Sequence, residues 1–150
     1  MTKLAVSACL LGESCRYNGK AKADATVIER AKAAGALAIC PECLGGLPTP
    51  RLPSEIRGGD GEDVLDGLAK VVDQAGRDVT AAFIKGAQEA LRLCQEAGVT
   101  EAILKARSPS CGAGTIYDGS FSGQCRPGMG VAAALFKRYG IALSTEEEAE

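Results

Sequence analysis

The chain has 150 residues, of which 46% are hydrophobic and 24% charged, so it suits one folded domain and disfavours a disordered segment. With 17 Lys and Arg against 19 Asp and Glu, the net charge of -2 gives no general attraction to nucleic acid or to an anionic membrane. Seven cysteines and no histidine exclude Ser-His-Asp and Cys-His catalysis within the chain, and the odd cysteine count disfavours a framework of disulfides alone.

The N-terminal apolar run, which ends at Cys9, is too short for a signal peptide or a membrane span. No other apolar stretch approaches spanning length. We therefore expect a cytoplasmic protein with no membrane partner, in a compartment where thiols stay reduced. Reduced cysteines in that setting are buried fillers, metal ligands or catalysts.

The chain begins with a predicted strand that leads into a loop. Residues 4–6 are apolar and are followed by small residues, which is typical of a buried strand that runs into a functional loop. Residues 9–20 contain an Asn-Gly turn, so we expect a loop there.

A helix and a second strand come next. Asp24 and Thr26 are candidates to cap a helix that runs to about Ala34, and Gly35 fits its C-terminal end. Residues 36–39 predict a second short apolar strand.

The middle of the chain changes character. Residues 41–53 hold four prolines and two glycines, which argues against any helix there. Residues 55–72 carry three glycines in their first half and alternate weakly, so we interpret them as an extended or hairpin excursion. A strong helix follows, with Asp78 as its N-cap and Gly98 at its end. Its apolar positions recur at helical spacing: Val79, Phe83, Ala87, Ala90, Leu91 and Cys94.

The last third of the chain predicts a strand, a loop, a helix and a strand. Residues 101–104 form the strand, and residues 105–112 form the loop that it delivers. Residues 128–139 form the helix, and residues 141–143 form the last strand. The acidic tail from Thr145 is expected to be frayed. The inward side chains of this helix are Val131, Leu135 and Phe136.

Strands that alternate with helices predict a single α/β domain over residues 1–150. We expect a mostly parallel open sheet of the Rossmann-like type, with helices on both faces and a hairpin excursion. In such sheets the ligand site lies at the carboxyl ends of the strands. Cys9, Cys40 and Cys111 each follow a predicted strand, so these three thiols are expected to converge on one edge of the sheet.

Three converging thiols leave more than one metal chemistry open. A structural zinc site takes four ligands, and a catalytic one takes three protein ligands and water. An iron–sulfur cube usually takes four thiolates, so three would leave one iron free for substrate or water. Glycines in the same loops allow close backbone approach: Gly12, Gly45, Gly46 and Gly112. Basic residues there offset negative charge or bind an anion: Arg16, Arg51, Lys105 and Arg107.

The motif Cys40-Pro-Glu-Cys43 has two possible uses. A lone C-x-x-C pair acts in redox chemistry when its first cysteine begins a helix. The following Leu-Gly-Gly-Leu-Pro argues against such a helix, which disfavours the redox use. Glu42 is a candidate proton carrier, because a chain without histidine needs a carboxylate near the metal; otherwise it is a solvated loop residue.

The remaining cysteines have weaker claims to the site. Cys94 lies on the apolar face of a helix and is expected to fill the core, and Cys125 is expected to be a bystander in a Gly-rich loop. Cys15 and Cys43 lie close in sequence to the proposed ligands. Three roles stay open for them: a spare ligand, a sulfur relay or a group that supports the ligands. Ser108 and Ser110 flank Pro109 and either cap the loop or contact substrate or cluster.

Several motifs together resemble a short bacterial domain long catalogued as of unknown function, whose characterised members are thiouracil desulfidases. The resemblance covers nearly the whole chain. Its motifs are Ser7-Ala-Cys-Leu-Leu-Gly12 with Cys15-Arg-Tyr-Asn-Gly19, Cys40-Pro-Glu42 with Gly45-Gly-Leu-Pro-Thr-Pro-Arg51, Gly76-Arg-Asp-Val-Thr80 with Phe83 and Gly86-Ala87, and Ser108-Pro-Ser-Cys-Gly112 with Ile116 through Gly123.

This resemblance implies a [4Fe–4S] cluster whose ligands carry over to Cys9, Cys40 and Cys111. It implies that the open iron binds the sulfur of 2-thiouracil or a related thionated base, which water converts to the oxo base and sulfide without electron transfer. The acid/base residue carries over to Glu42, assisted by Ser108, with Ser110 as the second choice.

Two other functions stay open at this point. One is a non-catalytic iron–sulfur or redox-sensing module. The other is a protein that handles sulfur in tRNA thiolation, although the net charge and the lack of a basic stripe make a nucleic-acid partner unfavourable. The sequence does not define an oligomeric state.

Overall fold

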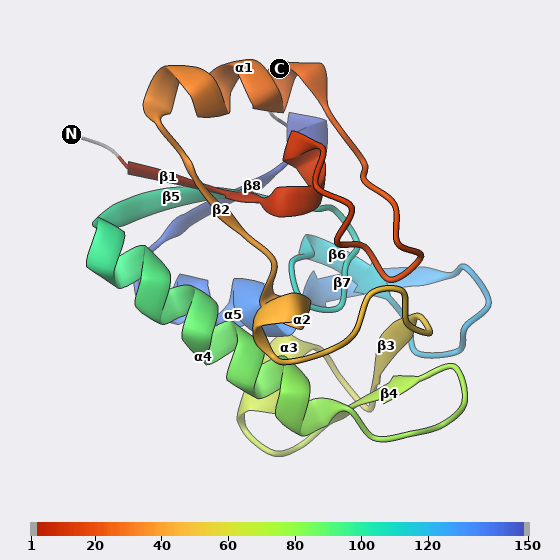
Figure 1. Ribbon diagram of the computed structural model, residues 1–150. Coiled ribbons are helices and arrows are strands. Elements are labelled where there is room, and N and C mark those ends of the chain that lie inside the picture. The colour runs from red at the N-terminus through yellow and green to blue at the C-terminus, as the bar shows by residue number, and fades with distance from the viewer. Residues whose placement is uncertain (1–2, 149–150) are drawn as a thin grey trace.

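Four parallel strands form the central sheet, in the order β2-β1-β5-β8 (Figure 1). The computed structural model describes residues 3–148. The four strands are β1 (Lys3–Ser7), β2 (Leu37–Ile39), β5 (Val99–Leu104) and β8 (Ala142–Thr145). The mostly parallel α/β sheet expected from the sequence is therefore confirmed.

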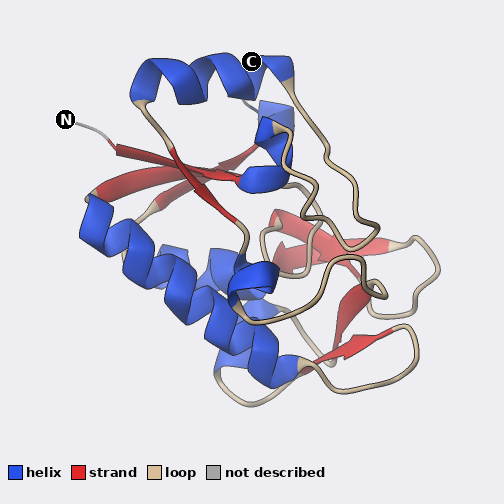
Figure 2. Cartoon of the chain, in the orientation of Figure 1, coloured by secondary structure: helices blue, strands red, loops and turns tan. Residues whose placement is uncertain are grey.

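Helices cover both faces of this sheet (Figures 1 and 2). Helix α1 (Ala25–Ala34) lies on one face, and α4 (Thr80–Ala97) and α5 (Val131–Arg138) lie on the other. Successive side chains of a strand point to opposite faces of the sheet, and so they pack against different helices. On β1, Leu4 and Val6 join the core beneath α1, while Ala5 joins the core beneath α4 and α5.

The helix ends follow the chemistry of their capping residues. The Asp24 side chain accepts a hydrogen bond from the Val27 amide at 3.1 Å, and Gly35 ends α1 in the left-handed conformation. Thr26 lies within that helix. At α4 the N-cap is Val79, one residue after the predicted Asp78, whose carboxylate accepts from the Thr80 amide.

Two antiparallel hairpins lie outside the central sheet. The first pairs β3 (Ser54–Arg57) with β4 (Lys70–Asp73), as the predicted excursion requires. Between its strands lies α3 (Gly61–Leu65), a helix that the sequence pattern did not indicate. Asp60 begins it through a capping box with Asp63.

The second hairpin pairs β6 (Ala113–Tyr117) with β7 (Cys125–Met129) and was not predicted. It also corrects the start of the last helix. Residues up to Met129 pair with β6, so α5 begins at Val131 instead of Gly128. Cys125 is the exposed first residue of β7, and its predicted place in a loop is wrong.

Two helical turns occur where the sequence predicted loops. Residues Ala8–Leu11 form the 3-10 turn η1 directly after β1. Residues Pro41–Leu44 form α2, so the expectation of no helix after Cys40 is wrong. Pro41 occupies the first helical position, where its missing amide hydrogen costs nothing and its fixed φ suits a helix.

The acidic tail is docked, not frayed, as far as the structure describes it. Residues Glu146–Glu148 form the turn η2 after β8. Glu146 pairs with Lys105 at 3.1 Å, and Glu147 pairs with Arg107 at 2.8 Å. Residues 149–150 lie outside the described residues. Within residues 3–148, no helix has the length and apolarity needed to cross a membrane.

Helix α2 packs against α4 through two glycines. Gly86 on α4 faces the Pro41 carbonyl oxygen, and Gly45 at the end of α2 faces the Ala82 carbonyl oxygen. A Cβ atom at either glycine would collide with that oxygen. The close approach fixes α2, and with it Cys40 and Glu42, relative to the helix layer.

We expect Gly86→Ala to destabilise the protein. Alanine favours a helix over glycine by roughly 1 kcal/mol, but forcing a methyl group into a packed contact costs about 1–3 kcal/mol. The clash therefore outweighs the gain, and the urea midpoint should fall. Lys85→Ala, at the exposed neighbouring position of α4, should leave the midpoint nearly unchanged. A raised midpoint in Gly86→Ala would contradict the close packing.

Candidate active site

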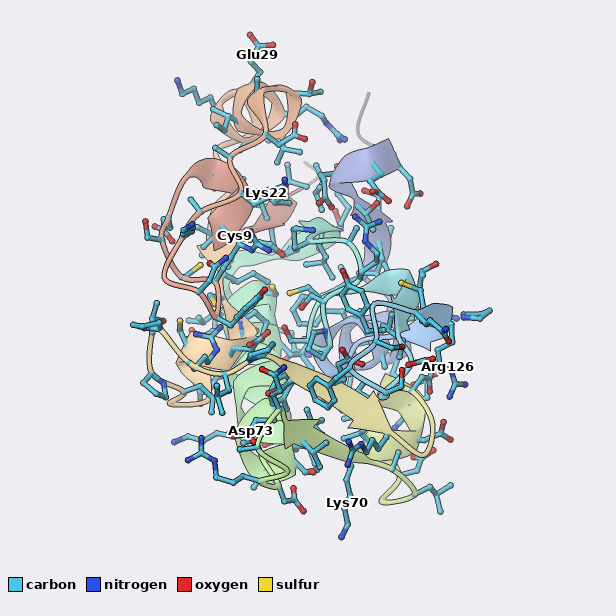
Figure 3. All side chains as sticks on the ribbon, turned by 90° about the vertical axis from the view of Figure 1, so that its right-hand side faces the viewer. Cys9, Lys22, Glu29, Lys70, Asp73 and Arg126 are labelled. Carbon is cyan, nitrogen blue, oxygen red and sulfur yellow. The ribbon has the colours of Figure 1, made fainter. Side chains whose placement is uncertain are left out.

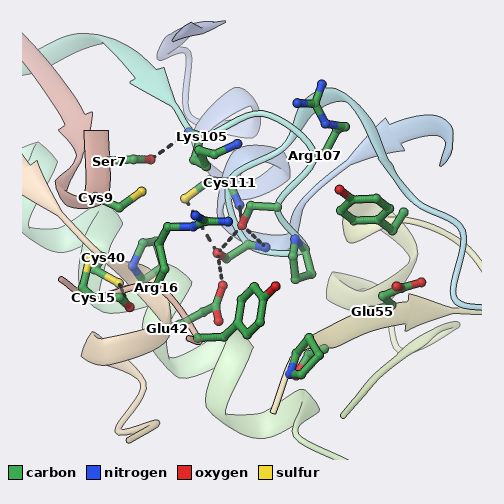
Figure 4. Close-up of a pocket in the computed structure, with 18 of the residues that line it drawn as sticks. Ser7, Cys9, Cys15, Arg16, Cys40, Glu42, Glu55, Lys105, Arg107 and Cys111 are labelled. Carbon is green, nitrogen blue, oxygen red and sulfur yellow. Dashed lines mark hydrogen bonds between the residues drawn. The ribbon is translucent and has the colours of Figure 1, made fainter. Parts of the chain in front are cut away.

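A cavity of about 350 Å³ opens at the carboxyl ends of the parallel strands. Figure 3 looks onto the side of the molecule where Cys9 lies, between α1 and the β3–β4 hairpin that ends at Asp73. Four thiols line the cavity: Cys9, Cys15, Cys40 and Cys111 (Figure 4). The three cysteines predicted to converge thus do lie together, and Cys15 joins them.

Each of the three predicted cysteines is held by an element that follows a strand. Cys9 lies in η1 directly after β1, and its thiol side chain is buried. Cys40 is the N-cap residue of α2, directly after β2. Cys111 lies at the end of the loop that follows β5, and it is 5% exposed.

The loop that carries Cys111 is fixed by the N-terminus of α5. The Pro109 carbonyl accepts from the Val131 amide at 2.8 Å, and the Ser110 carbonyl accepts from the Ala132 amide at 2.9 Å. These bonds satisfy amides that a helix N-terminus leaves without partners, because the N-cap Gly130 offers no side chain. A Cβ atom on Gly130 would lie 2.6 Å from the Ser110 carbonyl carbon, so only glycine allows this approach.

Without a cation, the site disfavours thiolates. Burial raises the pKa of the Cys111 thiol to about 12. A hydrogen bond with Cys15, and then burial, raise the pKa of Cys40. A bound cationic metal reverses this preference, because metal ligation requires the thiolate and releases its proton.

The donor set suits an iron–sulfur cluster better than a single ion. Among residues 3–148, no three Cys, Asp or Glu side chains converge on a point where one metal ion would bind. A cluster makes a different demand, because each iron takes its own thiolate and the ligands surround a volume. Soft thiols spread over the wall of one cavity meet that demand.

Glu42 enters the same cavity from α2. Its Oε1 atom pairs with the Arg51 guanidinium, with an Nη2–Oε1 distance of 2.9 Å. Its Oε2 atom accepts a hydrogen bond from the Ser110 hydroxyl at 2.9 Å (Figure 4). The Glu42 and Arg51 side chains are only 15% and 8% exposed, so the carboxylate is held in a fixed orientation at the edge of the cavity.

The two serines of the loop differ in what they contact. Ser110 donates to Glu42 and lies against the Cys111 sulfur at 3.7 Å. The Ser108 hydroxyl accepts from the Ser110 and Cys111 amides at 3.2 and 3.1 Å. The geometry therefore favours Ser110, the second choice of the sequence analysis, as the partner of Glu42, and gives Ser108 the shaping of the loop.

The four basic residues singled out in the sequence all line the cavity: Arg16, Arg51, Lys105 and Arg107. Glu42, Glu146 and Glu147 pair with the last three of these. Arg16 has no carboxylate partner among residues 3–148, and its guanidinium lies 5.9 Å from the ring centre of Tyr17. Arg16 is thus the one of these four cations that has no carboxylate partner among the residues that the structure describes.

The other cysteines divide between surface and core. Cys43 is exposed on α2, does not line the cavity and approaches Thr49 Oγ1 at 3.6 Å. That placement favours Cys40 over Cys43 as the thiol at the site. Cys94 is fully buried among core residues, and burial raises its pKa to about 11, as a filler residue requires.

Sequence reasoning missed the aromatic side chains and one of the carboxylates of the cavity. Tyr17, Tyr117 and Phe121 line it, together with Glu55, which is 8% exposed. The available signal was the scarcity of aromatic residues, since the chain has three Phe, three Tyr and no Trp. Three of these six side chains gather at one cavity.

Fold and site together define an α/β protein with a cavity beside the strand ends that is lined by thiols and one ion-paired carboxylate. The sequence then gives the family. The profile of the 2-thiouracil desulfurase family matches residues 4–148, and the chain belongs to that family.

Two similar proteins extend this comparison. A solved structure described as a [4Fe-4S]-dependent thiouracil desulfidase, TudS, superposes with a TM-score of 0.86 at 45% identity, and the match covers 99% of this chain and 93% of that chain. YbbK of Bacillus subtilis strain 168, described as an uncharacterized protein, is 48% identical over 143 residues, which is 95% of each chain. The resemblance recognised in the motifs is confirmed.

Proposed function

We propose that this protein is a [4Fe–4S]-dependent desulfidase that hydrolyses 2-thiouracil or a related thionated base to the oxo base and sulfide. The observation that carries the proposal is the meeting of three thiols and the Glu42–Ser110 pair in one cavity. The described activity of TudS, at 45% identity, supports it. Cys9, Cys40 and Cys111 would hold the cluster, whose open iron, when bound, supplies a soft Lewis acid for the thione sulfur.

The protein's own groups account for the proton transfers. Glu42 takes a proton from the attacking water, and the oxygen of that water bonds to the thione carbon. The C–S bond then breaks as the new hydroxyl group loses its proton to become the oxo group, and this proton and the one that Glu42 returns both leave with the sulfide. Arg51 holds one oxygen of Glu42, so the other oxygen faces Ser110 and the cavity. The Ser110 hydroxyl donates to the Glu42 carboxylate and is placed to stabilise negative charge that develops on the substrate. Atoms balance as thione plus water to oxo base plus hydrogen sulfide, and no electron is transferred.

Anaerobic reconstitution followed by a thiouracil assay tests this proposal. We expect a brown protein with about four irons per chain. The thione absorbance of 2-thiouracil should disappear as sulfide and uracil form in equal amounts. A colourless protein loaded with zinc would contradict the cluster. Turnover of thiolated tRNA alone would point instead to a role in tRNA thiolation, and a loaded protein without turnover would point to a sensor.

Ser110→Ala and Ser108→Ala should differ in kind. Ser110→Ala removes the bond to Glu42 and should lower kcat by about 10- to 100-fold with iron retained, since a hydrogen bond to a charged group is worth roughly 1.5–3 kcal/mol. Ser108→Ala removes the acceptor of two amides around Cys111, so it should lower cluster retention. Iron content and kcat, measured on the same preparations, separate the two effects. The reverse pattern would return the assisting role to Ser108.

A further inference from the structure

Three aromatic side chains line the cavity together with the thiols. They are Tyr17, Tyr117 and Phe121, half of the aromatic side chains in the chain. The other half have no part in the cavity: Phe83 and Phe136 are buried in the core, and Tyr139 is 60% exposed. A cavity of about 350 Å³ is small for a ligand site, so a planar ring inside it touches several walls at once.

A buried carboxylate holds the loop that carries Phe121. Glu55 lies on β3, and its Oε1 atom accepts from the Gly119 amide at 2.9 Å and from the Phe121 amide at 3.2 Å. These amides belong to the tip of the β6–β7 hairpin, more than sixty residues away in the chain. A charged group this deeply buried is costly unless hydrogen bonds satisfy it, and the loop supplies them.

The loop is held in a conformation that it would not adopt alone. Phe121 has a φ of 56°, in the left-handed region that bulky residues rarely occupy. Such residues persist where the surroundings impose the conformation, and they gather at sites that grip a ligand. Gly119 lies so close to β3 that a Cβ atom on it would be 2.5 Å from the Ile56 carbonyl oxygen. The tip is therefore clamped onto β3 on both sides of Ser120.

A cation orients the ring itself. The Arg57 guanidinium lies 5.6 Å from the ring centre of Phe121, and its Nε donates to the Gly119 carbonyl at 3.0 Å. The ring is half-buried and also lines the cavity. Hydrogen bonds, backbone conformation and a cation–π contact thus together fix the position of the Phe121 ring, which lines the cavity.

We propose that Phe121 binds the substrate by stacking on its planar heteroaromatic ring, and that Glu55 is a positioning residue that acts through the loop. This inference rests on the proposed function and adds a specificity to it. In the proposed function the open iron of the cluster binds the sulfur of the substrate, and Phe121 recognises the flat ring that carries this sulfur. The site therefore prefers an aromatic thione over a saturated one with the same thiocarbonyl and N–H groups.

Phe121→Ala tests the stacking. We expect KM for 2-thiouracil to rise by about 5- to 150-fold, the equivalent of one stacked base, with kcat changed less than about threefold. Equilibrium binding of uracil, measured by calorimetry on the cluster-loaded protein, should weaken by a similar factor. Phe121→Tyr should restore both values, and Phe121→Leu, which keeps apolar volume without a π face, should not. Unchanged KM and uracil affinity in Phe121→Ala would overturn the proposal.

The ratio of kcat/KM for 2-thiouracil to that for 5,6-dihydro-2-thiouracil gives a second readout. The dihydro compound keeps the thiocarbonyl and both N–H groups but lacks the flat ring. The ratio should fall in Phe121→Ala, and also in Glu55→Ala, which frees the loop. Glu55→Gln retains an acceptor oxygen for both amides and should keep the native ratio. An unchanged ratio in Glu55→Ala would overturn the positioning role. General damage to the fold lowers kcat/KM for both substrates alike and so leaves the ratio unchanged.

The outcome is separable from the fate of the proposed function. If the native protein turns over neither 2-thiouracil nor a related thionated base, the proposed function fails before any variant is made. If it does turn over 2-thiouracil while Phe121→Ala matches it in KM, ratio and uracil affinity, only the present inference fails. Tyr139→Ala, which removes an exposed aromatic ring outside the cavity, is the matched control and should change none of these values.

Discussion

Serine in place of Cys9, Cys40 or Cys111 is expected to remove the cluster. The iron content should fall from about four per chain to well below one, and turnover should fall to background. A hydroxyl is a hard, weakly acidic group that does not ligate iron as a thiolate does. Because Cys111 is buried behind the α5 N-terminus, no neighbouring thiol takes its place without moving that loop. Iron analysis and the visible absorption of anaerobically reconstituted protein measure the effect.

The other cysteines supply matched controls for the same substitution. Cys15→Ser is the sharpest, because this thiol lines the cavity and contacts both Cys9 and Cys40. It should retain its iron. Cys43→Ser, on the exposed side of α2, should also retain iron. If Cys15→Ser or Cys43→Ser lost the cluster while Cys40→Ser kept it, the ligand assignment would be wrong.

A cysteine far from the cavity separates cluster loss from general destabilisation. Cys94→Ser buries a hydroxyl in an apolar core, which costs roughly 1–3 kcal/mol of stability. We expect a lower thermal midpoint and a full complement of iron. Iron loss in this variant would show that the assay reports folding and not ligation.

The features that were predicted correctly from the sequence are those indicated by the spacing of apolar residues along the chain. Predicted strands of three or four mostly apolar residues, separated by helices, indicated a parallel sheet, and in a parallel sheet the residues that follow the strands lie at one edge. That reasoning placed Cys9, Cys40 and Cys111 at one cavity without knowledge of any contact between them. The helix α4 was equally clear, because six positions of its apolar face repeat at helical spacing.

The features that were missed are short and depend on local geometry. Helix α2 has four residues, too few for periodicity, and its proline reads as a helix breaker unless it stands at the first position. Helix α3 depends on the reciprocal bonds of Asp60 and Asp63. The tail seemed free by charge alone, yet its carboxylates pair with Lys105 and Arg107 from a loop forty residues earlier.

Helix α2 bears on whether Cys40 and Cys43 act as a redox pair. Cys40 does stand at a helix N-terminus, so the premise used against a redox Cys40–Cys43 pair fails. The structure supplies a different reason against that role. Contact with Cys15, and then burial, raise the pKa of Cys40, whereas redox catalysis needs a lowered one. The helix has a single turn, and its own Glu42 lies in that turn, where a carboxylate offsets the field of the amides.

The choice between Ser108 and Ser110 was beyond the reach of sequence. Both flank Pro109, and either hydroxyl could have turned toward the cavity. The docking of the loop on α5 decides between them. In the docked loop the Ser110 hydroxyl donates to Glu42, and the Ser108 hydroxyl accepts from two backbone amides. Contacts between residues 68 positions apart are a product of the whole fold.

Glu42→Gln is expected to abolish turnover while the cluster stays in place. Glutamine keeps the size and one acceptor oxygen of the side chain but cannot take a proton from water. Loss of a general base lowers kcat by roughly 10²- to 10⁴-fold. Arg51 keeps three other acceptors, the Pro48 carbonyl at 3.0 Å, the Thr49 hydroxyl at 3.1 Å and the Cys15 carbonyl at 3.1 Å, so the guanidinium is held when the charge of Glu42 is gone.

The iron content and the KM of this variant decide what kind of residue Glu42 is. If Glu42 carries the proton, iron stays near four per chain, KM changes little and kcat falls. If Glu42 only holds Ser110 and the Cys111 loop, iron falls with kcat, and Ser110→Ala reproduces the whole loss. Glu62→Gln breaks an ion pair with Arg138 on the surface and should leave kcat unchanged. A native kcat in Glu42→Gln would show that Glu42 is not the general base. Because the chain has no histidine, another cavity group would then have to take the proton, and Glu55 is the other carboxylate that lines the cavity.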